Sequence, residues 1–325
     1  MDQADFTTGN VVIDLTAVVI GVADDEPRAL VVDGAGEPGP PALPSGPLRA
    51  EHRTLQAGLR AWVEDQTNHP LGYVEQLYTF GDRAPRDAVA QAAGRRLSIA
   101  YLALVPEVGS VPGSHARWRP WYSFFPWEDW RRGEPERFDA VADALKAWAE
   151  RTSGATRAER LERVRMTFGL EGAGWDEERA LERYELLYEA AVVPEAWVDQ
   201  GREPPDTVRG MPGLSMDQDH RRILATAISR LRGKIKYRPV LFELLPEEFT
   251  LYQLQRTAEA LSGIRLHKQN FRRRVERLGL VEDTGRLATD TGGRPAKLMR
   301  FRPEVTHERP APGVRVHATR RGAYP

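Results

Sequence analysis

Apolar and polar positions alternate most regularly in residues 248–302, near the C-terminal end of the chain. Apolar residues first recur there at helical spacing, at Leu251, Leu254, Ala258 and Leu261. Thr250 followed by Gln253 fits a capping box at the start of this helix, and Gly263 predicts its end. The segment therefore predicts an amphipathic helix that is followed by a tight turn.

A second helix is predicted over residues 266–278, with a buried stripe formed by Phe271, Val275 and Leu278. Its exposed side carries long cationic and amide side chains: Lys268, Gln269, Arg272, Arg273 and Arg274. After a turn at residues 291–293, the run of residues 294–297 alternates like the edge of a hairpin. Two helices followed by a hairpin predict a winged helix-turn-helix.

The charge of this segment points to double-stranded DNA as its partner. Residues 250–302 hold 12 Lys and Arg against 5 Asp and Glu, on a chain whose net charge is -1. Such a local excess is expected at a nucleic-acid face; a solvated pair of amphipathic helices is the alternative. The side chains that can match base edges in the major groove are Gln269, Asn270 and Arg273. The cations expected at phosphates are Lys268, Arg272 and Arg274 on the helix and Arg294 and Lys297 on the wing. Asn270 could equally cap the turn.

The N-terminal part of the chain predicts an α+β domain. Segments rich in Val, Ile and aromatic residues predict four strands, at residues 10–22, 29–33, 73–80 and 96–105. Between the second and third strands lie a loop of Gly and Pro at residues 34–47 and a helix at residues 53–66. This order of elements favours a mixed sheet covered by helices.

Residues 43–67, LPSGPLRAEHRTLQAGLRAWVEDQT, resemble the Nudix box when Gly46 is taken as its first glycine. The positions that keep the residue type of the box are Arg60, Glu64 and Asp65. His52 and Ala61 stand where the box has glutamates. In that family the glutamates hold Mg²⁺ against a pyrophosphate, which requires several carboxylate oxygens. The resemblance therefore implies a Nudix-like domain without Mg²⁺ and without catalytic residues.

Residues 117–213 predict a helical insertion. Four of the eight tryptophans fall within residues 117–135, a density that fits a buried anchor or a subunit contact better than a stacking pocket for a nucleotide. Helical periodicity follows at residues 138–150, 157–168 and 176–191, and a long helix at residues 217–235 joins the two parts of the chain. Asp219 beside His220 suggests acid–base chemistry or, more commonly, a cap or a satisfied contact.

The whole arrangement resembles the Nudix-related transcriptional regulators of NAD metabolism, on the phrases DHRRILATAISRLRGKIKYRPVLFELLPEEFTLYQLQ, NFRRRVERLGL and GRPAKLMRF. The resemblance implies a homodimeric DNA-binding repressor whose Nudix-like domain senses ADP-ribose or a related nucleotide and needs no other cofactor. The residues expected near that ligand are Arg60, Glu64, Gln76, Tyr78 and Phe80. One alternative is an active Nudix pyrophosphohydrolase with an accessory nucleic-acid-binding domain; another is a winged helix that serves only in dimerisation.

Composition narrows the chemistry further. The chain has 325 residues, enough for two domains, and no cysteine, which excludes disulfides, thiolate metal sites and cysteine nucleophiles. The longest apolar run, residues 15–22, is too short to span a bilayer, so we expect a cytoplasmic protein. The expected organisation is a Nudix-like domain at residues 1–116, the insertion at 117–213, the linker helix and winged helix at 214–305, and a flexible tail at 306–325.

Overall fold

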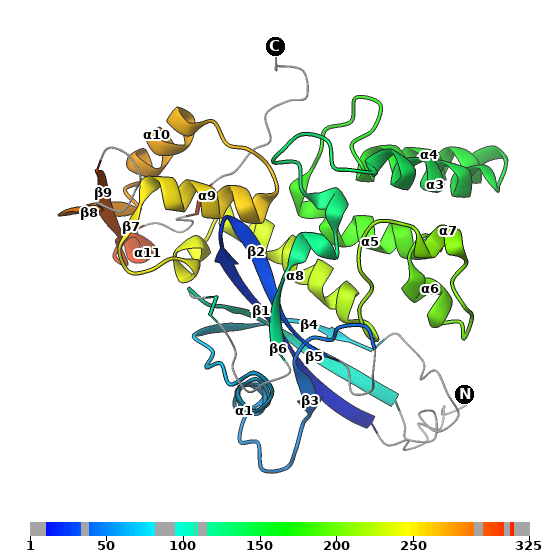
Figure 1. The fold of residues 1–325 in the computed structure, drawn as a ribbon, viewed down its shortest axis with the longest axis horizontal. Helices are drawn as coiled ribbons and strands as arrows, with labels where there is room; N and C mark the ends of the chain where they lie inside the picture. Colours follow the sequence, from blue (N-terminus) through cyan, green and yellow to red (C-terminus); the bar gives the residue numbers. More distant parts are fainter. Residues whose placement is uncertain are drawn as a thin grey trace, which may run out of the picture.

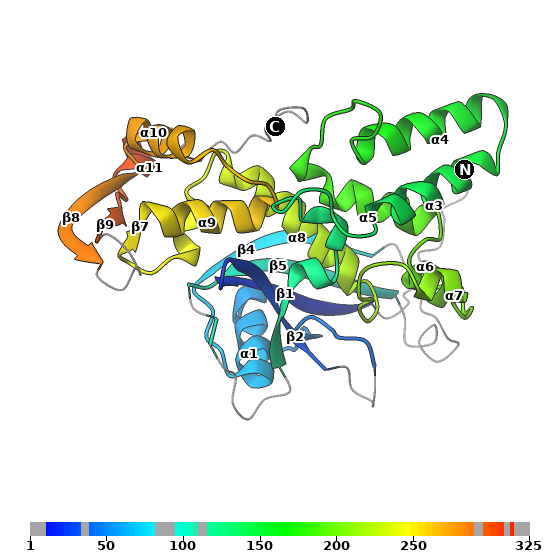
Figure 2. The same cartoon turned by 45° about the horizontal axis from the view of Figure 1, so that its top comes forward.

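A mixed β-sheet lies between one helix below and several helices above, and a winged helix extends from one end (Figure 1, Figure 2). The computed structural model describes residues 11–33, 39–81, 95–106, 108–109, 116–288, 295–308 and 313–314. Within these ranges no helix combines the length and the apolar character needed to cross a bilayer. The predicted α+β class, a mixed sheet with helices and a C-terminal winged helix-turn-helix, is confirmed.

The central sheet has the strand order β4-β5-β1-β2-β6, with β3 paired to β1. Its strands are β1 (Val11–Ala23), β2 (Glu26–Val32), β3 (Ser45–Pro47), β4 (Tyr73–Phe80), β5 (Arg95–Leu104) and β6 (Ala116–Pro120). β1 and β5 run parallel, and the other pairs are antiparallel. β1 and β2 form a tight hairpin, because Asp24 and Asp25 both adopt left-handed backbone angles, with φ of 53° and 61°.

The two faces of β1 pack against different helices, because side chains alternate along a strand. Leu15, Ala17 and Val19 share a buried cluster with Leu59 and Val63 of helix α1 (Leu55–Thr67). The intervening residues face the linker helix α8 (His220–Ile235) on the other side of the sheet.

The helical insertion packs along α8. Its elements are η1 (Trp121–Ser123), η2 (Pro126–Glu128), α3 (Phe138–Glu150), α4 (Gly154–Thr167), η3 (Glu177–Arg179), α5 (Ala180–Glu189), α6 (Pro194–Val198) and α7 (Asp206–Arg209). Trp121 and Trp127 are almost completely buried, which confirms the tryptophan-rich run as a buried anchor. One continuous set of buried residues extends from the upper face of the sheet through the insertion and α8 into the winged helix.

The winged helix has the two helices and the two wing strands that its sequence predicts, preceded by η4 (Val240–Leu244) and β7 (Phe249–Thr250), which were not predicted. The predicted elements are α9 (Leu251–Ser262), α10 (Lys268–Leu278), β8 (Val281–Ala288) and β9 (Ala296–Phe301). The Thr250 hydroxyl accepts from the Gln253 amide at 3.1 Å, while Gln253 Oε1 accepts from the Thr250 amide at 2.7 Å. The predicted capping box is therefore present, and Gly263 ends α9 in the left-handed conformation with φ of 72°.

Three expectations need correction. β3 lies in the segment that the sequence assigns to a loop, and β6 continues the sheet to Pro120, past the predicted start of the insertion at residue 117. The tail predicted at residues 306–325 overlaps a short helix, α11 (Val305–Glu308), and Val314 is buried. The two strands β3 and β6 were missed because they are short and β6 contains two arginines and a proline, so neither has the apolar alternation of a typical strand.

Candidate nucleic-acid interface and pocket

Helix α10 presents its polar side to solvent. Phe271 and Val275 are buried against the rest of the winged helix, whereas the residues that are exposed include Lys268, Gln269, Asn270 and Arg273. The helix begins two residues later than predicted, and its N-cap is His267. Asn270 therefore lies inside the first turn, where its Oδ1 accepts from Arg273 Nη2 at 3.3 Å. The exposed face has the size and the donors of a helix that enters the major groove.

Arg272 and Arg274 are only half-exposed. The Nε atom of Arg272 is buried and has no hydrogen-bond partner among the described residues. Of the three predicted phosphate contacts on α10, Lys268 is thus the most exposed.

The cations of the wing are already paired with carboxylates of the same domain. Lys297 Nζ lies 2.6 Å from Asp283 Oδ2, and Arg300 pairs with Glu282 across the two wing strands. The hydrogen bond from Lys297 lowers the pKa of the Asp283 carboxyl and keeps it ionised. Arg294, the other cation predicted on the wing, lies outside the described residues. A DNA phosphate would therefore have to compete with Asp283 for Lys297, the contact that the sequence predicts.

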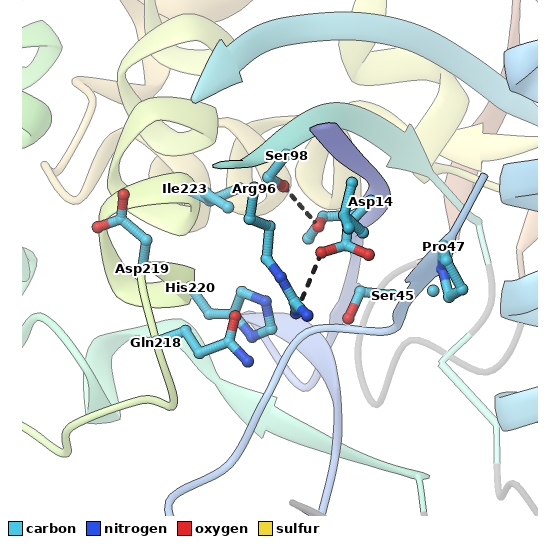
Figure 3. Close-up of a pocket in the computed structure, with 12 residues that line it drawn as sticks. Asp14, Ser45, Pro47, Arg96, Ser98, Gln218, Asp219, His220 and Ile223 are labelled. Carbon is cyan, nitrogen blue, oxygen red and sulfur yellow. Dashed lines mark hydrogen bonds and ion pairs between the residues drawn. The ribbon is translucent and has the colours of Figure 1, made fainter. Parts of the chain in front are cut away.

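A pocket of about 430 Å³ opens between the sheet and the N-terminal end of α8 (Figure 3). Its lining comes from three strands and the start of the linker helix: Val12, Asp14, Thr16, Ser45, Gly46, Pro47, Arg96, Ser98, Gln218, Asp219, His220 and Ile223. Gly46, the first glycine of the box-like segment, is one of these residues. The polar residues of β1 point into the pocket because they alternate with the apolar residues that face α1.

Charged and hydroxyl groups converge on the sheet side of this pocket. Arg96 Nη1 lies 3.2 Å from Asp14 Oδ2, and the hydroxyls of Thr16 and Ser98 are hydrogen-bonded at 2.8 Å. Burial raises the pKa of Asp14, an effect that Arg96 partly opposes. The Arg96 side chain is 56% exposed. It can therefore meet an anionic ligand at the mouth of the pocket, while Asp14 and the hydroxyls can bind ligand hydroxyls deeper inside.

His220 fixes the start of α8 to the sheet domain. Its Nδ1 accepts a hydrogen bond from the Leu43 amide at 3.0 Å. Burial lowers the pKa of His220 to about 4, so at neutral pH the ring is uncharged and its Nε2 carries the proton. The prediction that the Asp219-His220 pair makes a satisfied contact is confirmed for the histidine.

The five residues predicted to bind the ligand lie elsewhere. Arg60 donates to the carbonyl oxygens of Leu71 and Gly72 and so stabilises the turn after α1. Glu64 is exposed on α1, below the sheet, and does not line the pocket. The remaining three are on the edge strand β4: Gln76 and Tyr78 are exposed, and Phe80 is buried with its ring 5.2 Å from that of Tyr78. None of the five lines the pocket described here.

His52 and Ala61 stand at the positions of the box-like segment where the Nudix box has glutamates. His52 Nδ1 accepts from the Arg49 amide at 3.1 Å, and Ala61 is exposed. Glu64 and Asp65, which keep their carboxylates, are exposed on α1.

Comparisons with known proteins agree with this architecture. The family model of the NrtR DNA-binding winged helix domain matches residues 241–301. The curated ADPR responsive transcriptional repressor NtrR of Acinetobacter baylyi is 40% identical over 88 residues, a match that spans 27% of this chain and 35% of that protein.

Two solved structures share the fold over most of the chain. The crystal structure of Shewanella oneidensis NrtR in complex with a 27mer DNA has a TM-score of 0.54 and 22% identity, covering 91% of this chain and 95% of that one. A MutT/nudix family protein from Enterococcus faecalis has a TM-score of 0.51 and 13% identity, covering 93% and 90%. These likenesses show a Nudix-like sheet and a winged helix in the same order.

Proposed function

We propose that this chain, whose residues 241–301 form a winged helix of the NrtR type, is a transcriptional repressor that releases or binds DNA in response to an ADP-ribose-like nucleotide. The exposed cationic face of α10 within the matched segment carries the proposal. The Acinetobacter relative is named for its response to ADPR, and the Shewanella protein was solved on DNA. We propose that this chain shares both properties, the response to an ADP-ribose-like nucleotide and the binding of DNA.

The DNA-binding half of the proposal places α10 in the major groove, with Gln269, Asn270 and Arg273 at base edges and Lys268 at a phosphate. One winged helix offers a small contact area, so a homodimer on a two-fold site is expected. Sequencing the fragments that the purified chain retains from a random pool would identify that site. An Arg273→Ala variant should lose about 1–3 kcal/mol of discrimination at one base position. Lys146→Ala, which removes an exposed charge of the insertion, is the control and should leave binding unchanged.

The effector half places the nucleotide in the pocket at the start of α8. Arg96 suits a phosphate, and Asp14 suits the hydroxyls of a ribose. Loss of a charge-assisted hydrogen bond costs about 1.5–3 kcal/mol, so Arg96→Ala should weaken ADP-ribose binding by roughly tenfold or more in calorimetry on the full chain. Gln76→Ala on β4 is the matched test of the site predicted from the sequence. A loss with Gln76→Ala and none with Arg96→Ala would move the ligand to β4.

We also propose that the protein is not a pyrophosphatase, because His52 and Ala61 leave the box-like segment short of the carboxylates that hold Mg²⁺. Incubation with ADP-ribose and NADH in Mg²⁺ or Mn²⁺ checks this. Turnover near about 1 s⁻¹, a common enzyme rate, would favour the hydrolase alternative.

A further inference from the structure

Glu128, at the end of η2, is completely buried between two buried arginines. Arg183 of α5 donates from Nε and Nη2 to its two oxygens, and Arg232 of α8 donates to Oε2. Burial alone would raise the pKa of Glu128, but the two guanidinium groups outweigh it and hold the pKa below its usual range. Because removal of one partner would leave a buried charge uncompensated, this cluster constrains the geometry around it.

Arg232 also reaches the winged helix. Its Nε donates to the carbonyl of Leu261 at 2.9 Å, in the last turn of α9, and its Nη1 donates to the carbonyl of Glu177 at 3.0 Å. A cation is favourable at the C-terminal end of a helix, where carbonyls lack partners. One side chain therefore joins the linker helix, the insertion and the end of α9.

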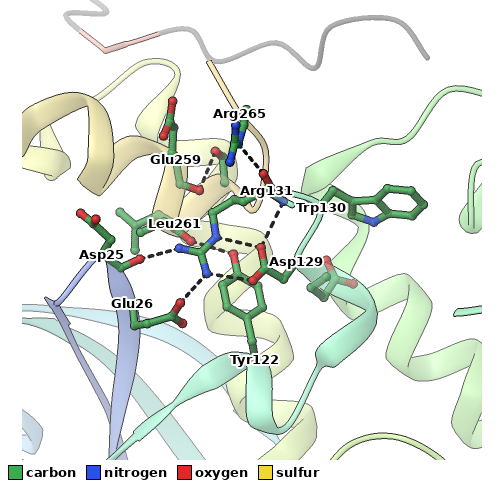
Figure 4. A network of polar contacts seen from close by, with 12 residues as sticks. Asp25, Glu26, Tyr122, Asp129, Trp130, Arg131, Glu259, Leu261 and Arg265 are labelled. Carbon is green, nitrogen blue, oxygen red and sulfur yellow. Dashed lines mark hydrogen bonds and ion pairs between the residues drawn. The ribbon is translucent and has the colours of Figure 1, made fainter. Parts of the chain in front are cut away.

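Three further hydrogen bonds join the insertion to the end of α9 and the turn before α10, and Figure 4 shows the one between Arg265 and Arg131. They are Tyr122 Oη to Ala260 O at 2.7 Å, the Trp130 amide to Gly263 O at 2.7 Å, and Arg265 Nε to Arg131 O at 2.6 Å. We name these bonds, together with the contacts of Arg232 to Glu128 and Leu261, the clamp.

The clamp is tied to the central sheet as well. Arg131 donates to Glu26 Oε1 at 2.8 Å and to the carbonyl of Asp25, both at the tip of the β1–β2 hairpin. Arg256 of α9 lies 2.9 Å from the Asp25 carboxylate. The turn that precedes α10 is thus held by the sheet, the insertion and the linker helix together.

We propose that Tyr122, Glu128 and Arg232 are positioning residues for DNA binding, which fix the orientation of α10 through the clamp. The inference rests on the proposed function of α10. The other end of α8 lines the pocket, and the 16 residues of this helix span about 24 Å at 1.5 Å per residue. A ligand that shifts α8 would consequently move Arg232 and, with it, the turn before α10.

A distance measurement between spin labels tests the clamp without any ligand. The chain has no cysteine, so Gln56→Cys on α1 and Glu276→Cys on α10, both at exposed positions, provide the only label sites. Labelled protein diluted into unlabelled protein reports the distance within one chain. Tyr122→Phe removes one clamp hydrogen bond and keeps the ring, and Glu128→Gln breaks the buried cluster. Tyr101→Phe, in the buried cluster beneath the sheet, is the control.

We expect a narrow distance distribution in the parent and in Tyr101→Phe, and a broader or shifted one in Tyr122→Phe and Glu128→Gln. DNA affinity should fall by roughly fivefold or more, the low end of typical coupling between sites, in the variants whose distribution broadens. If Glu128→Gln fails to fold, Tyr122→Phe decides. Unchanged distributions in the folded variants would overturn the proposal, and so would broad distributions with unchanged DNA affinity. If the parent chain bound no DNA at all, the proposed function would fail, while the distances would still report on the clamp.

Discussion

Replacement of Gly263 by Ala is expected to destabilise the protein by roughly 2–5 kcal/mol. Its φ of 72° is left-handed, which costs an alanine roughly 1–2 kcal/mol. A Cβ there would also overlap the carbonyl oxygen of Glu128 and lie 2.9 Å from Tyr122 Oη. Overpacking of this kind adds roughly 1–3 kcal/mol, because the carbonyl belongs to a residue of the clamp and also accepts from Arg232 Nη2 at 3.4 Å.

Gly279 provides the matched control for this substitution. It ends α10 with φ of 57°, and a Cβ there would meet only Arg302 Nη1 at 3.3 Å, the end of a flexible side chain. Gly279→Ala should therefore lower the free energy of unfolding only by the roughly 1–2 kcal/mol that a left-handed backbone costs an alanine. Urea unfolding followed by circular dichroism measures both losses under the same conditions. Equal losses would show that the turn before α10 is free to move away from the insertion, and the reasoning behind the clamp would be wrong.

Two further predictions concern charge. Lys268→Ala should reduce the slope of log affinity for DNA against log salt concentration by about one unit. Lys297→Ala should reduce this slope clearly less, because Lys297 is already paired with Asp283. Fluorescence anisotropy over a salt series measures both slopes, and an equal reduction in the two variants would contradict the prediction. The pKa of His220 is about 4 in the folded chain against an ordinary 6.5. The stability that depends on a neutral ring is therefore fully present above pH 6.5 and is lost as the pH falls to about 4. The free energy of unfolding should decrease by up to roughly 3 kcal/mol over this range. His220→Asn can still accept from the Leu43 amide and should lack this part of the acid sensitivity; identical pH curves of unfolding free energy would count against a buried neutral histidine.

Local signals predicted the winged helix well, because each of them acts within a few residues. The capping box of Thr250 and Gln253 and the left-handed Gly263 fix α9 without reference to the rest of the fold. The exposed face of α10 follows in the same way from the spacing of Phe271 and Val275.

The pocket could not be predicted in the same way, because it depends on distant parts of the chain. Asp14 and His220 belong to the same pocket, although more than half of the sequence separates them. A weak signal existed in β1, where Asp14 and Thr16 interrupt an otherwise apolar strand. The partners of Arg60 could not be predicted for a related reason: they are the backbone carbonyls of Leu71 and Gly72, and every residue type carries a carbonyl.

The continuous core has a consequence for how this protein can change in evolution. In a chain of independent domains, each domain has its own core and can be exchanged while the other is kept. Here the apolar residues of the sheet, the insertion and the winged helix cover one another, so a cut at either boundary would expose them to water. Burial is worth about 25 cal/mol per Å² of apolar surface, and neither fragment could recover it alone. The insertion thus joins the sheet and the winged helix in one core, so that exchange of either part would require a new set of complementary apolar contacts.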